Sequence, residues 1–465
     1  MHLLDYIFKP RALAVIGASS NPGKFGFQFI KYVTGHPFSG KIYPVNPSGG
    51  EVFGRKIYPD IRSVDGEIDL AIILTPAHTV LETIKQCADK GVKGIILVTA
   101  GFGETGKEGK RLEEEVVSLT HSRGIRMVGP NCIGALNLEI GLNASGISVA
   151  PTGVGSMGLI SQSGSSLEML FSLSRERSGY FNKAVSCGNQ ADLTICDYLE
   201  YFADDPNINV IMMYIEGIDQ KEGRRFIDLA RETVPKKPVV VLKVGRSPVA
   251  TRVISSHTGS MVGSVESYRA VFRQYGIIEA LSFEELFDFG LAFSKGRIPQ
   301  SNRVALLGPG GPTVSGADVL TEDGIELPEF SSETLASINR VSPSFVAGTK
   351  NPLDPTPAFP IDKRHHLFRA LMNDENTDGA IICTFAAWYM KKFSETIPSI
   401  YAESTKPLLL GSIMSMTIPE VYDAAKVVGE AGIPFFPSPE RAAKAYAALV
   451  RYSCFKRGLN RNQSV

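Results

Sequence analysis

The sequence lacks any charge imbalance, because its 465 residues contain 48 Lys and Arg against 48 Asp and Glu. Proteins that bind nucleic acids or membrane surfaces usually carry excess positive charge, so this balance argues against both kinds of partner. No apolar run approaches the ~18 residues that a membrane helix needs, and residues 1–11 contain no apolar stretch of signal-peptide length. We therefore expect a cytoplasmic protein with no nucleic-acid and no membrane partner.

Cysteine is scarce and scattered. The six cysteines form no C-x-x-C pair, which argues against a disulfide framework and against a zinc site. We expect reduced, mostly structural thiols and no metal. The cysteines are Cys87, Cys132, Cys187, Cys196, Cys383 and Cys454.

Two familiar site motifs are missing as well, and the first glycine-rich turn lacks the spacing of a third. There is no G-x-S-x-G nucleophile elbow, which disfavours Ser-His-Glu hydrolysis, and no G-x-x-x-x-G-K-[ST] phosphate loop. The first glycine-rich turn has glycines at 17, 23 and 26, which is not the G-x-G-x-x-G spacing. The next strand ends in Asn46-Pro47, where a ribose-binding acid would be expected. NAD is therefore disfavoured, and a different adenine cofactor is favoured.

One arrangement occurs three times: a short apolar strand, a turn rich in Gly and Ser, and a helix-like stretch. It begins at Leu13–Ser19, Met157–Gly164 and Val304–Gly311. Further apolar runs of four to six residues follow each at spacings suited to βαβ crossovers. The pattern predicts an α/β protein of three consecutive Rossmann-like or flavodoxin-like domains with doubly wound parallel sheets. We place them at residues 1–138, 150–295 and 302–455, with linkers at Asn143–Gly155 and Ser294–Asn302.

The turn Gly17–Gly26 opens a predicted helix at about Phe25. Backbone N–H groups and the helix dipole at such a turn suit a phosphate or pyrophosphate, and Lys24 adds positive charge. Thr75-Pro76-Ala77 and Thr99–Gly103 follow other strands and would line the same crevice. The alternative is that the glycines only let helix and strand pack closely.

The second unit carries the candidate chemistry. Ser161–Ser166 precedes a helical run and predicts a second anion site, and Glu216 ends the strand-like run Val210–Ile215. Ile254–Gly263 is a small-residue segment, predicted as a loop, that offers His257 to something outside it. A carboxylate against one imidazole nitrogen fixes the tautomer and leaves the other as a nucleophile. An anion site, a carboxylate and a histidine together suggest phosphoryl transfer through phosphohistidine.

The segment Val128–Gly134 offers two further polar groups. Asn131 could hydrogen-bond a ligand, and Cys132 could be a nucleophile. For Cys132 we prefer a structural role, because no neighbouring histidine or metal partner can be named from the sequence.

The ordered set of motifs resembles the nucleoside-diphosphate-forming acyl-CoA synthetases. It is close to the alpha subunit of the ADP-forming acetate-type enzymes and more distantly similar to the alpha subunit of succinyl-CoA synthetase. The motifs span nearly the whole chain: Gly17–Gly26, Tyr43–Pro47, Gly101–Gly106, Gly129–Cys132, Ser161–Gly164, Gly188–Asp192, Tyr214–Gly217 and Ser256–Ser260.

The resemblance implies a role for each candidate residue. His257 would carry the phosphate, Glu216 would stabilise it, and Ser163, Gly164 and Ser165 would cradle it. Coenzyme A would contact Gly17, Ser19, Ser20, Gly23, Lys24, Asn46, Pro47, Thr75, Pro76, Ala77 and Asn131. The substrate pocket would include Asn189, Ala191 and Asp192.

The implied reaction converts acyl-CoA, phosphate and ADP to a carboxylic acid, coenzyme A and ATP through an acyl phosphate and a phosphohistidine. The three units leave no segment long enough for an ATP-grasp fold. ADP or ATP with Mg²⁺ is therefore expected on a separate ATP-grasp beta subunit of a hetero-oligomer. The alternative is a non-catalytic acyl-CoA-binding or regulatory module, and a Rossmann oxidoreductase is a weaker third choice.

Overall fold

A computed structural model describes residues 2–151, 153–177, 179–258, 264–295, 297–341, 350–355, 359–384 and 387–462. The chain forms two compact units. The first contains Met1–Ser172 and Tyr180–Phe272, and the second contains Leu173–Gly179 and Arg273–Val465. Of the helices in these described ranges, none is both long and apolar enough to cross a membrane.

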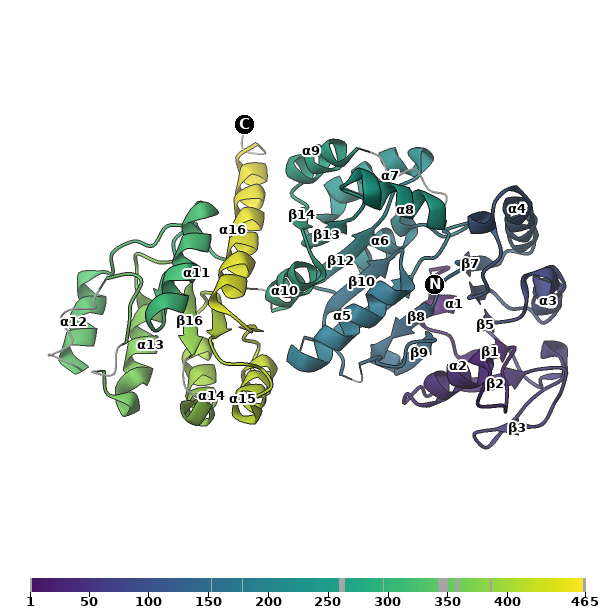
Figure 1. The fold of residues 1–465 in the computed structure, drawn as a ribbon, viewed down its shortest axis with the longest axis horizontal. Helices are drawn as coiled ribbons and strands as arrows, with labels where there is room; N and C mark the ends of the chain where they lie inside the picture. Colours follow the sequence, from purple (N-terminus) through teal and green to yellow (C-terminus); the bar gives the residue numbers. More distant parts are fainter. Residues whose placement is uncertain are drawn as a thin grey trace. The chain divides into compact units, whose positions relative to one another are not determined.

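The first unit begins with a parallel sheet in the order β2-β1-β5-β6-β7 (Figure 1). Its strands are buried apolar runs, as expected when helices cover both faces of a parallel sheet. The strands are β1 (Ala12–Ile16), β2 (Lys41–Val45), β5 (Leu70–Ile73), β6 (Gly94–Leu97) and β7 (Arg126–Val128). The other elements are α1 (Asp5–Phe8), α2 (Phe25–Thr34), α3 (Val80–Asp89), α4 (Lys107–Ser122) and the short pair β3 (Glu51–Val52) and β4 (Arg55–Lys56).

A second sheet of the first unit contains strands in the order β13-β12-β10-β11-β8-β9. Its parallel strands are β10 (Met157–Ser161), β11 (Phe181–Ser186), β12 (Val210–Ile215) and β13 (Val239–Lys243). The antiparallel pair is β8 (Gly134–Asn137) and β9 (Leu142–Ser145). The helices that follow these strands are α5 (Gly164–Arg177), α6 (Ile195–Asp204), α7 (Gln220–Thr233), α8 (Pro248–Thr258) and α9 (Val265–Tyr275).

The predicted linker Asn143–Gly155 is wrong at its start, because β9 runs to Ser145 and pairs with β8. Asn143 and Ser145 are buried, and the Ser145 hydroxyl donates a 2.5 Å hydrogen bond to the Asn143 side-chain oxygen. Their polar composition indicated a loop. In the fold the Asn143 oxygen is paired locally inside an edge strand, whereas its buried side-chain nitrogen has no hydrogen-bond partner among the described residues.

The second unit contains the parallel sheet β15-β16-β17-β18. The strands are β15 (Ala305–Leu307), β16 (Ala380–Thr384), β17 (Leu408–Ser412) and β18 (Phe435–Phe436), and β14 (Ile278–Ala280) precedes them in the chain. The helices are α10 (Phe283–Ser294), α11 (Gly310–Glu322), α12 (Ser332–Val341), α13 (Arg364–Asn373), α14 (Ala387–Ala402), α15 (Pro419–Glu430) and α16 (Pro439–Asn462). The predicted linker Ser294–Asn302 falls between α10 and β15.

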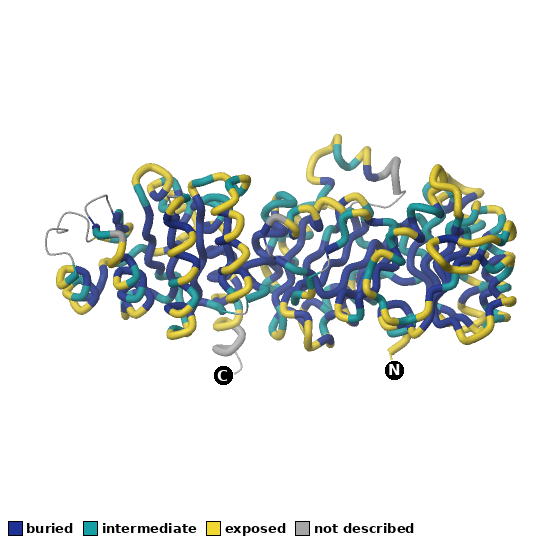
Figure 2. The backbone as a smooth tube through the Cα atoms, turned by 90° about the horizontal axis from the view of Figure 1, so that it is seen from below, coloured by how far each residue is buried: buried dark blue, intermediate teal, exposed yellow. Residues whose placement is uncertain are grey.

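Within each unit the strands are buried, and exposed residues gather on helices and turns (Figure 2). The mainly parallel, helix-covered sheets confirm the predicted α/β class. The exact domain boundaries given above stay predictions.

Candidate active site

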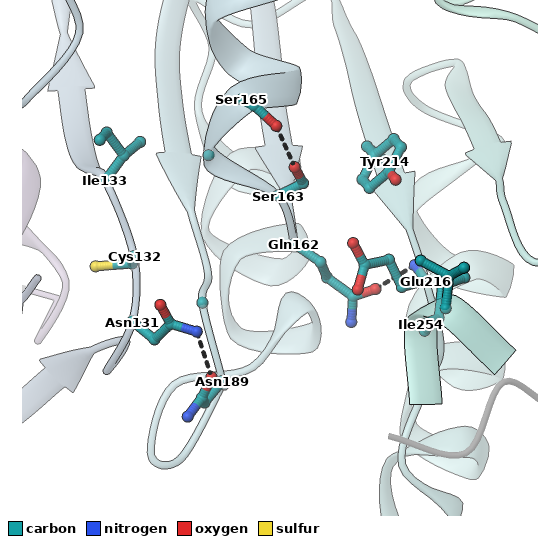
Figure 3. Close-up of a pocket in the computed structure, with 13 residues that line it drawn as sticks. Asn131, Cys132, Ile133, Gln162, Ser163, Ser165, Asn189, Tyr214, Glu216 and Ile254 are labelled. Atoms are coloured by element: carbon teal, nitrogen blue, oxygen red, sulfur yellow. Dashed lines mark hydrogen bonds between the residues drawn. The ribbon is translucent and has the colours of Figure 1, made fainter. Parts of the chain in front are cut away.

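A cavity of about 470 Å³ lies at the carboxyl edge of the second sheet (Figure 3). Carboxyl ends of neighbouring parallel strands meet at one edge, so segments distant in sequence converge there. Residues after β10, β11 and β12 line it, together with the β7–β8 loop and α8. The lining residues are Asn131, Cys132, Ile133, Gln162, Ser163, Gly164, Ser165, Gly188, Asn189, Tyr214, Glu216, Val253 and Ile254.

One wall is the start of α5, which begins at Gly164. The Ser163 and Ser165 hydroxyl oxygens are 3.1 Å apart, and the Ser163 N–H donates to the Ser161 hydroxyl at 3.2 Å. The first N–H groups of a helix have no partner within the helix and attract anions. All three predicted phosphate-cradle residues therefore line the cavity at a helix N-terminus.

Glu216 lies across the cavity, directly after β12 (Figure 3). It is half-buried, and its side chain is drawn beside Gln162. The sequence therefore placed this carboxylate correctly at a strand end that faces the predicted anion site.

The segment that carries His257 differs from the prediction. Helix α8 extends from Pro248 to Thr258, so the backbone at His257 belongs to a helix rather than to a loop. The His257 side chain and residues 259–263 lie outside the described residues. Val253 and Ile254 of the same helix line the cavity.

Two asparagines from different loops meet at the cavity. The Asn131 side-chain amide donates to the Asn189 side-chain oxygen at 3.2 Å. The Asn189 amide in turn donates to Glu104 at 2.5 Å and to Glu113 at 3.0 Å. The two carboxylates thus fix which way the Asn189 amide faces.

Glu104 belongs to the Gly101–Gly106 motif, for which the sequence suggested no specific role. Partial burial works to raise the pKa of Glu104, but hydrogen bonds from Asn189 and from the Gly101 N–H lower it below its ordinary value. The charged form is therefore favoured. Sequence analysis missed Glu104 and Glu113 because they act on the cavity only through Asn189.

The structure brings one of the three predicted substrate-pocket residues into the cavity. Asn189 lines it, whereas Ala191 and Asp192 are absent from its described lining. Asp192 is almost fully buried and accepts hydrogen bonds from the Arg126 side chain and, at 2.7 Å, from the Met127 N–H. Ala191 packs against the core of the first sheet. Both residues serve packing between the two sheets of the first unit.

Cys132 lines the cavity, but the described structure gives it no activating partner. Its thiol donates to the Leu97 carbonyl at 3.4 Å, and burial raises its pKa to about 12. A thiolate is the reactive form, so the structural role predicted for Cys132 is supported.

The predicted coenzyme site gathers at the carboxyl edge of the first sheet. Its residues follow β1, β2 and β5, which are neighbours in the order β2-β1-β5. Gly17 has φ +97°, and a Cβ on Gly26 would lie 2.0 Å from the Gly17 carbonyl oxygen. The packing role left open for these glycines is therefore real, and it seats the N-terminus of α2 directly on the turn.

Side chains at this edge fit a polar ligand. The Asn46 amide donates to the Ala18 carbonyl at 2.8 Å and shapes the turn. Lys24 is the residue immediately before α2. The Thr75 hydroxyl oxygen is shielded from solvent and has no hydrogen-bond partner among the described residues. A cation, a helix N-terminus and an unused hydroxyl are groups that a phosphate-bearing cofactor can engage.

Comparison with known proteins agrees with a coenzyme site on the first sheet and a separate cavity on the second. Residues 11–137 match the profile of a CoA binding domain, and residues 154–293 match that of a succinyl-CoA ligase like flavodoxin domain.

Full-length relatives give the same picture. The chain is 40% identical to the acetate–CoA ligase (ADP-forming) II subunit alpha of Pyrococcus furiosus, covering 97% of this chain and 98% of that one. It is 37% identical to acetate–CoA ligase (ADP-forming) I of Archaeoglobus fulgidus, but it spans only 64% of that longer protein.

A solved structure is similar throughout. It is the dinucleotide-forming acetyl-coenzyme A synthetase 1 of Ca. Korarchaeum cryptofilum, in complex with phosphate and ADP. The TM-score is 0.90 at 35% identity, over 99% of both chains. These relatives favour the catalytic interpretation over a non-catalytic binding module. The chain belongs to the ADP-forming acyl-CoA synthetases, as a member of their alpha-subunit type.

Proposed function

We propose that the cavity at the end of the second sheet is where an acyl group, phosphate and His257 exchange partners. The main support is that one cavity is lined by Ser163–Ser165, by Glu216 and by two residues of the helix bearing His257. Position 257 comes three and four residues after Ile254 and Val253, a spacing that puts helix positions on one face.

The reaction divides into three balanced steps. Phosphate attacks the acyl-CoA carbonyl, the C–S bond breaks, and coenzyme A leaves as its thiolate. An imidazole nitrogen of His257 then attacks the phosphorus of the acyl phosphate, and the carboxylate of the acid leaves. Finally the phosphoryl group passes from His257 to the terminal phosphate of ADP, which forms ATP.

Each described residue has a part in the first two steps. The N-terminus of α5 and the serine hydroxyls bind the phosphate oxygens and stabilise the charge that spreads over them. Glu216 accepts a hydrogen bond from His257, which orients the ring and stabilises its positive charge as the N–P bond forms. The Asn131 amide, which has a second N–H beyond its bond to Asn189, positions the acyl carbonyl, and Asn189 holds Asn131 in place.

Coenzyme A binds at the carboxyl edge of the first sheet in this proposal. The turn Gly17–Lys24 and the N-terminus of α2 hold its phosphates, and Asn46-Pro47 and Thr75–Ala77 line the crevice. Asn131 lies on the loop that leads from the first sheet to the cavity, where the thioester would arrive. The match of residues 11–137 to a CoA binding domain supports this placement.

The last step belongs to a second polypeptide. We propose an ATP-grasp beta subunit that binds ADP or ATP with Mg²⁺ and forms a hetero-oligomer with this chain. The Archaeoglobus fulgidus relative, whose name mentions no subunit, is longer than this chain, which supports a need for additional sequence. As substrate we propose acetyl-CoA, because both relatives compared above are named for acetate.

The test is phosphorylation of His257. The purified chain, incubated with acetyl-CoA and radiolabelled phosphate, should acquire an acid-labile, alkali-stable label. The His257→Ala variant should acquire none, and His366→Ala, which changes an exposed histidine of the second unit, should label normally. Full labelling of His257→Ala would refute the assignment. ATP formation from ADP should require an added ATP-grasp subunit.

A further inference from the structure

Side chains hold the backbone of the turn that presents Glu216. It leaves the end of β12, where the parallel ladder stops, and its backbone groups need other partners. The turn has five such groups: the N–H and carbonyl of Glu216, the N–H and carbonyl of Gly217, and the N–H of Ile218. Each is hydrogen-bonded to one of three side chains, which come from different parts of the first unit.

Gln162 satisfies three of the five groups. Its side-chain oxygen accepts hydrogen bonds from the N–H groups of Glu216 and Gly217, the latter at 3.1 Å. Its amide nitrogen donates to the Gly217 carbonyl at 2.7 Å. Gln162 directly follows β10, which lies beside β12, and it is 9% exposed. Because both ends of one amide are used, the group is locked in orientation.

Lys243 satisfies the fourth group from the opposite side. It is the last residue of β13, the other neighbour of β12, and it is 1% exposed. Its ammonium donates to the Glu216 carbonyl at 2.8 Å and to the Val244 carbonyl at 2.5 Å. It also lies 4.8 Å from the centre of the Tyr268 ring.

Tyr268 of α9 satisfies the fifth. Its hydroxyl accepts a 2.9 Å hydrogen bond from the Ile218 N–H. We name Gln162, Lys243 and Tyr268 the Glu216 clamp. Side chains from two flanking strand ends and one helix thus fix the backbone from which the Glu216 carboxylate projects.

We propose that the Glu216 clamp is a set of positioning residues for phosphoryl transfer, and that Lys243 also contributes its positive charge to the carboxylate and anion site. This inference rests on the proposed role of Glu216. Pre-organised sites need supporting residues that lock the groups in contact with substrate, and a small loosening is costly. The clamp meets that need with hydrogen bonds whose partners are all buried or half-buried.

The charge of Lys243 is conditional on pH. Burial lowers its pKa to about 8, and the titratable groups acting on it are the opposing carboxylate of Glu216 and the facing Tyr268 ring. A neutral amine keeps two N–H groups for the two carbonyls, but the positive charge beside Glu216 is lost. Phosphohistidine formation should therefore weaken as pH rises through about 8.

The experiment measures phosphohistidine formation from acetyl-CoA and radiolabelled phosphate, by rapid quench, between pH 6.5 and about 9.5. Gln162→Glu keeps the acceptor and loses the donor to Gly217. Lys243→Met keeps the chain length and loses the charge and both donors. Each should slow the step by about 10- to 100-fold, the range for removing an outer partner of a functional ligand. Lys243→Met should also lose the alkaline decline near pH 8.

The matched control is Lys183→Met, which removes a second buried lysine from the same sheet, on β11. Calorimetric binding of coenzyme A, expected unchanged, shows that each variant is folded. If Lys243→Met does not fold, Gln162→Glu decides alone.

The outcomes separate the two proposals. A wild-type chain that forms no phosphohistidine refutes the proposed function. A wild-type chain that forms it, with Gln162→Glu equally fast or with a Lys243→Met pH profile unchanged from wild type, refutes the clamp.

Discussion

Two lysines are buried in the second sheet, and they lie toward opposite edges of it. Lys183, the third residue of β11, is 2.6 Å from Glu139 and 2.8 Å from Asp205, and it also donates to Asn182. Lys243, the last residue of β13, donates only to backbone carbonyls in its described hydrogen bonds. One lysine is neutralised by two acids, and the other keeps its charge available.

The two buried lysines of this sheet have different roles: Lys183 pairs with acidic side chains, and Lys243 holds the turn beside the cavity. At the Lys183 edge, burial opposes ionisation of Glu139 and Asp205, yet hydrogen bonds from Lys183 lower the pKa of both carboxyls. The Lys183 ammonium is thus paired with acidic side chains rather than with the backbone of a cavity turn. At the Lys243 edge, the described hydrogen bonds of Lys243 hold the backbone of the turn from which Glu216 projects.

The largest expected effect on catalysis comes from changing Glu216 rather than Glu139. Glu216→Gln should slow phosphorylation of His257 by order 10²–10⁴, the range for a removed acid–base partner, while the free energy of unfolding stays within about 1 kcal/mol of wild type. Rapid-quench labelling and denaturant unfolding of the same preparation measure both. If Glu216→Gln were labelled at the wild-type rate, the proposed difference between the Lys243 and Lys183 sites would be wrong.

Lys183→Met should have the opposite signature. Removing the ammonium leaves the buried carboxylate of Asp205 without this partner and close to Glu139, which should lower the free energy of unfolding by about 3–5 kcal/mol. Molecules that remain folded should form phosphohistidine at the wild-type rate. Urea unfolding and labelling per folded molecule test this, and a slowed rate with unchanged stability would contradict it.

Glu139→Gln should lower the free energy of unfolding less than Lys183→Met does. Lys183 keeps Asp205 and Asn182, so only one charge-assisted hydrogen bond is weakened. We expect a loss of about 1–2 kcal/mol in unfolding free energy and no change in labelling rate. The matched pair Glu139→Gln and Glu216→Gln thus makes the same chemical change at the two edges.

The free energy of unfolding should rise with pH at both sites, but in different pH ranges. Carboxyls with lowered pKa stabilise the fold above their ordinary range near 4 and lose that contribution as pH falls through the folded value. Lys243 has a folded pKa lowered to about 8 from an ordinary 10.5. Between these values only the unfolded chain holds the proton, so stability rises with pH there.

The check is the difference in unfolding free energy between wild type and Lys243→Met across pH 7.5 to about 10. Wild type should gain relative to the variant as pH rises. A flat difference would mean that Lys243 does not change protonation on folding in this range.

The sequence predicted most strands and helices correctly, but it missed the helix that carries His257. The apolar run Val210–Ile215 coincides with β12, the strand expected before Asn46-Pro47 is β2, and α2 begins at the predicted Phe25. Continuous apolar runs are what buried parallel strands require, so this signal is strong. The small residues before His257 predicted a loop, yet α8 continues to Thr258 because Ser and Thr tolerate a helix when nothing breaks it.

Residues proposed to touch a ligand directly were easier to find than those proposed to act through others. Ser163, Glu216 and Asn189 stand in short motifs after predicted strands, which is a visible signal. Gln162 and Lys243 meet the Glu216 turn only because β10 and β13 flank β12. That strand order is not contained in local patterns. Asp192 shows the converse error, since its place in a polar motif hid a buried role with Arg126.

The most direct test is a rapid-quench comparison of phosphohistidine formation, per folded molecule, in wild type, Glu216→Gln and Lys183→Met. Acetyl-CoA and radiolabelled phosphate are the substrates, and peptide mapping locates the label. The account predicts label at His257, a rate reduced by order 10²–10⁴ in Glu216→Gln and an unchanged rate in Lys183→Met. Label at another residue, or equal slowing by both variants, would contradict it.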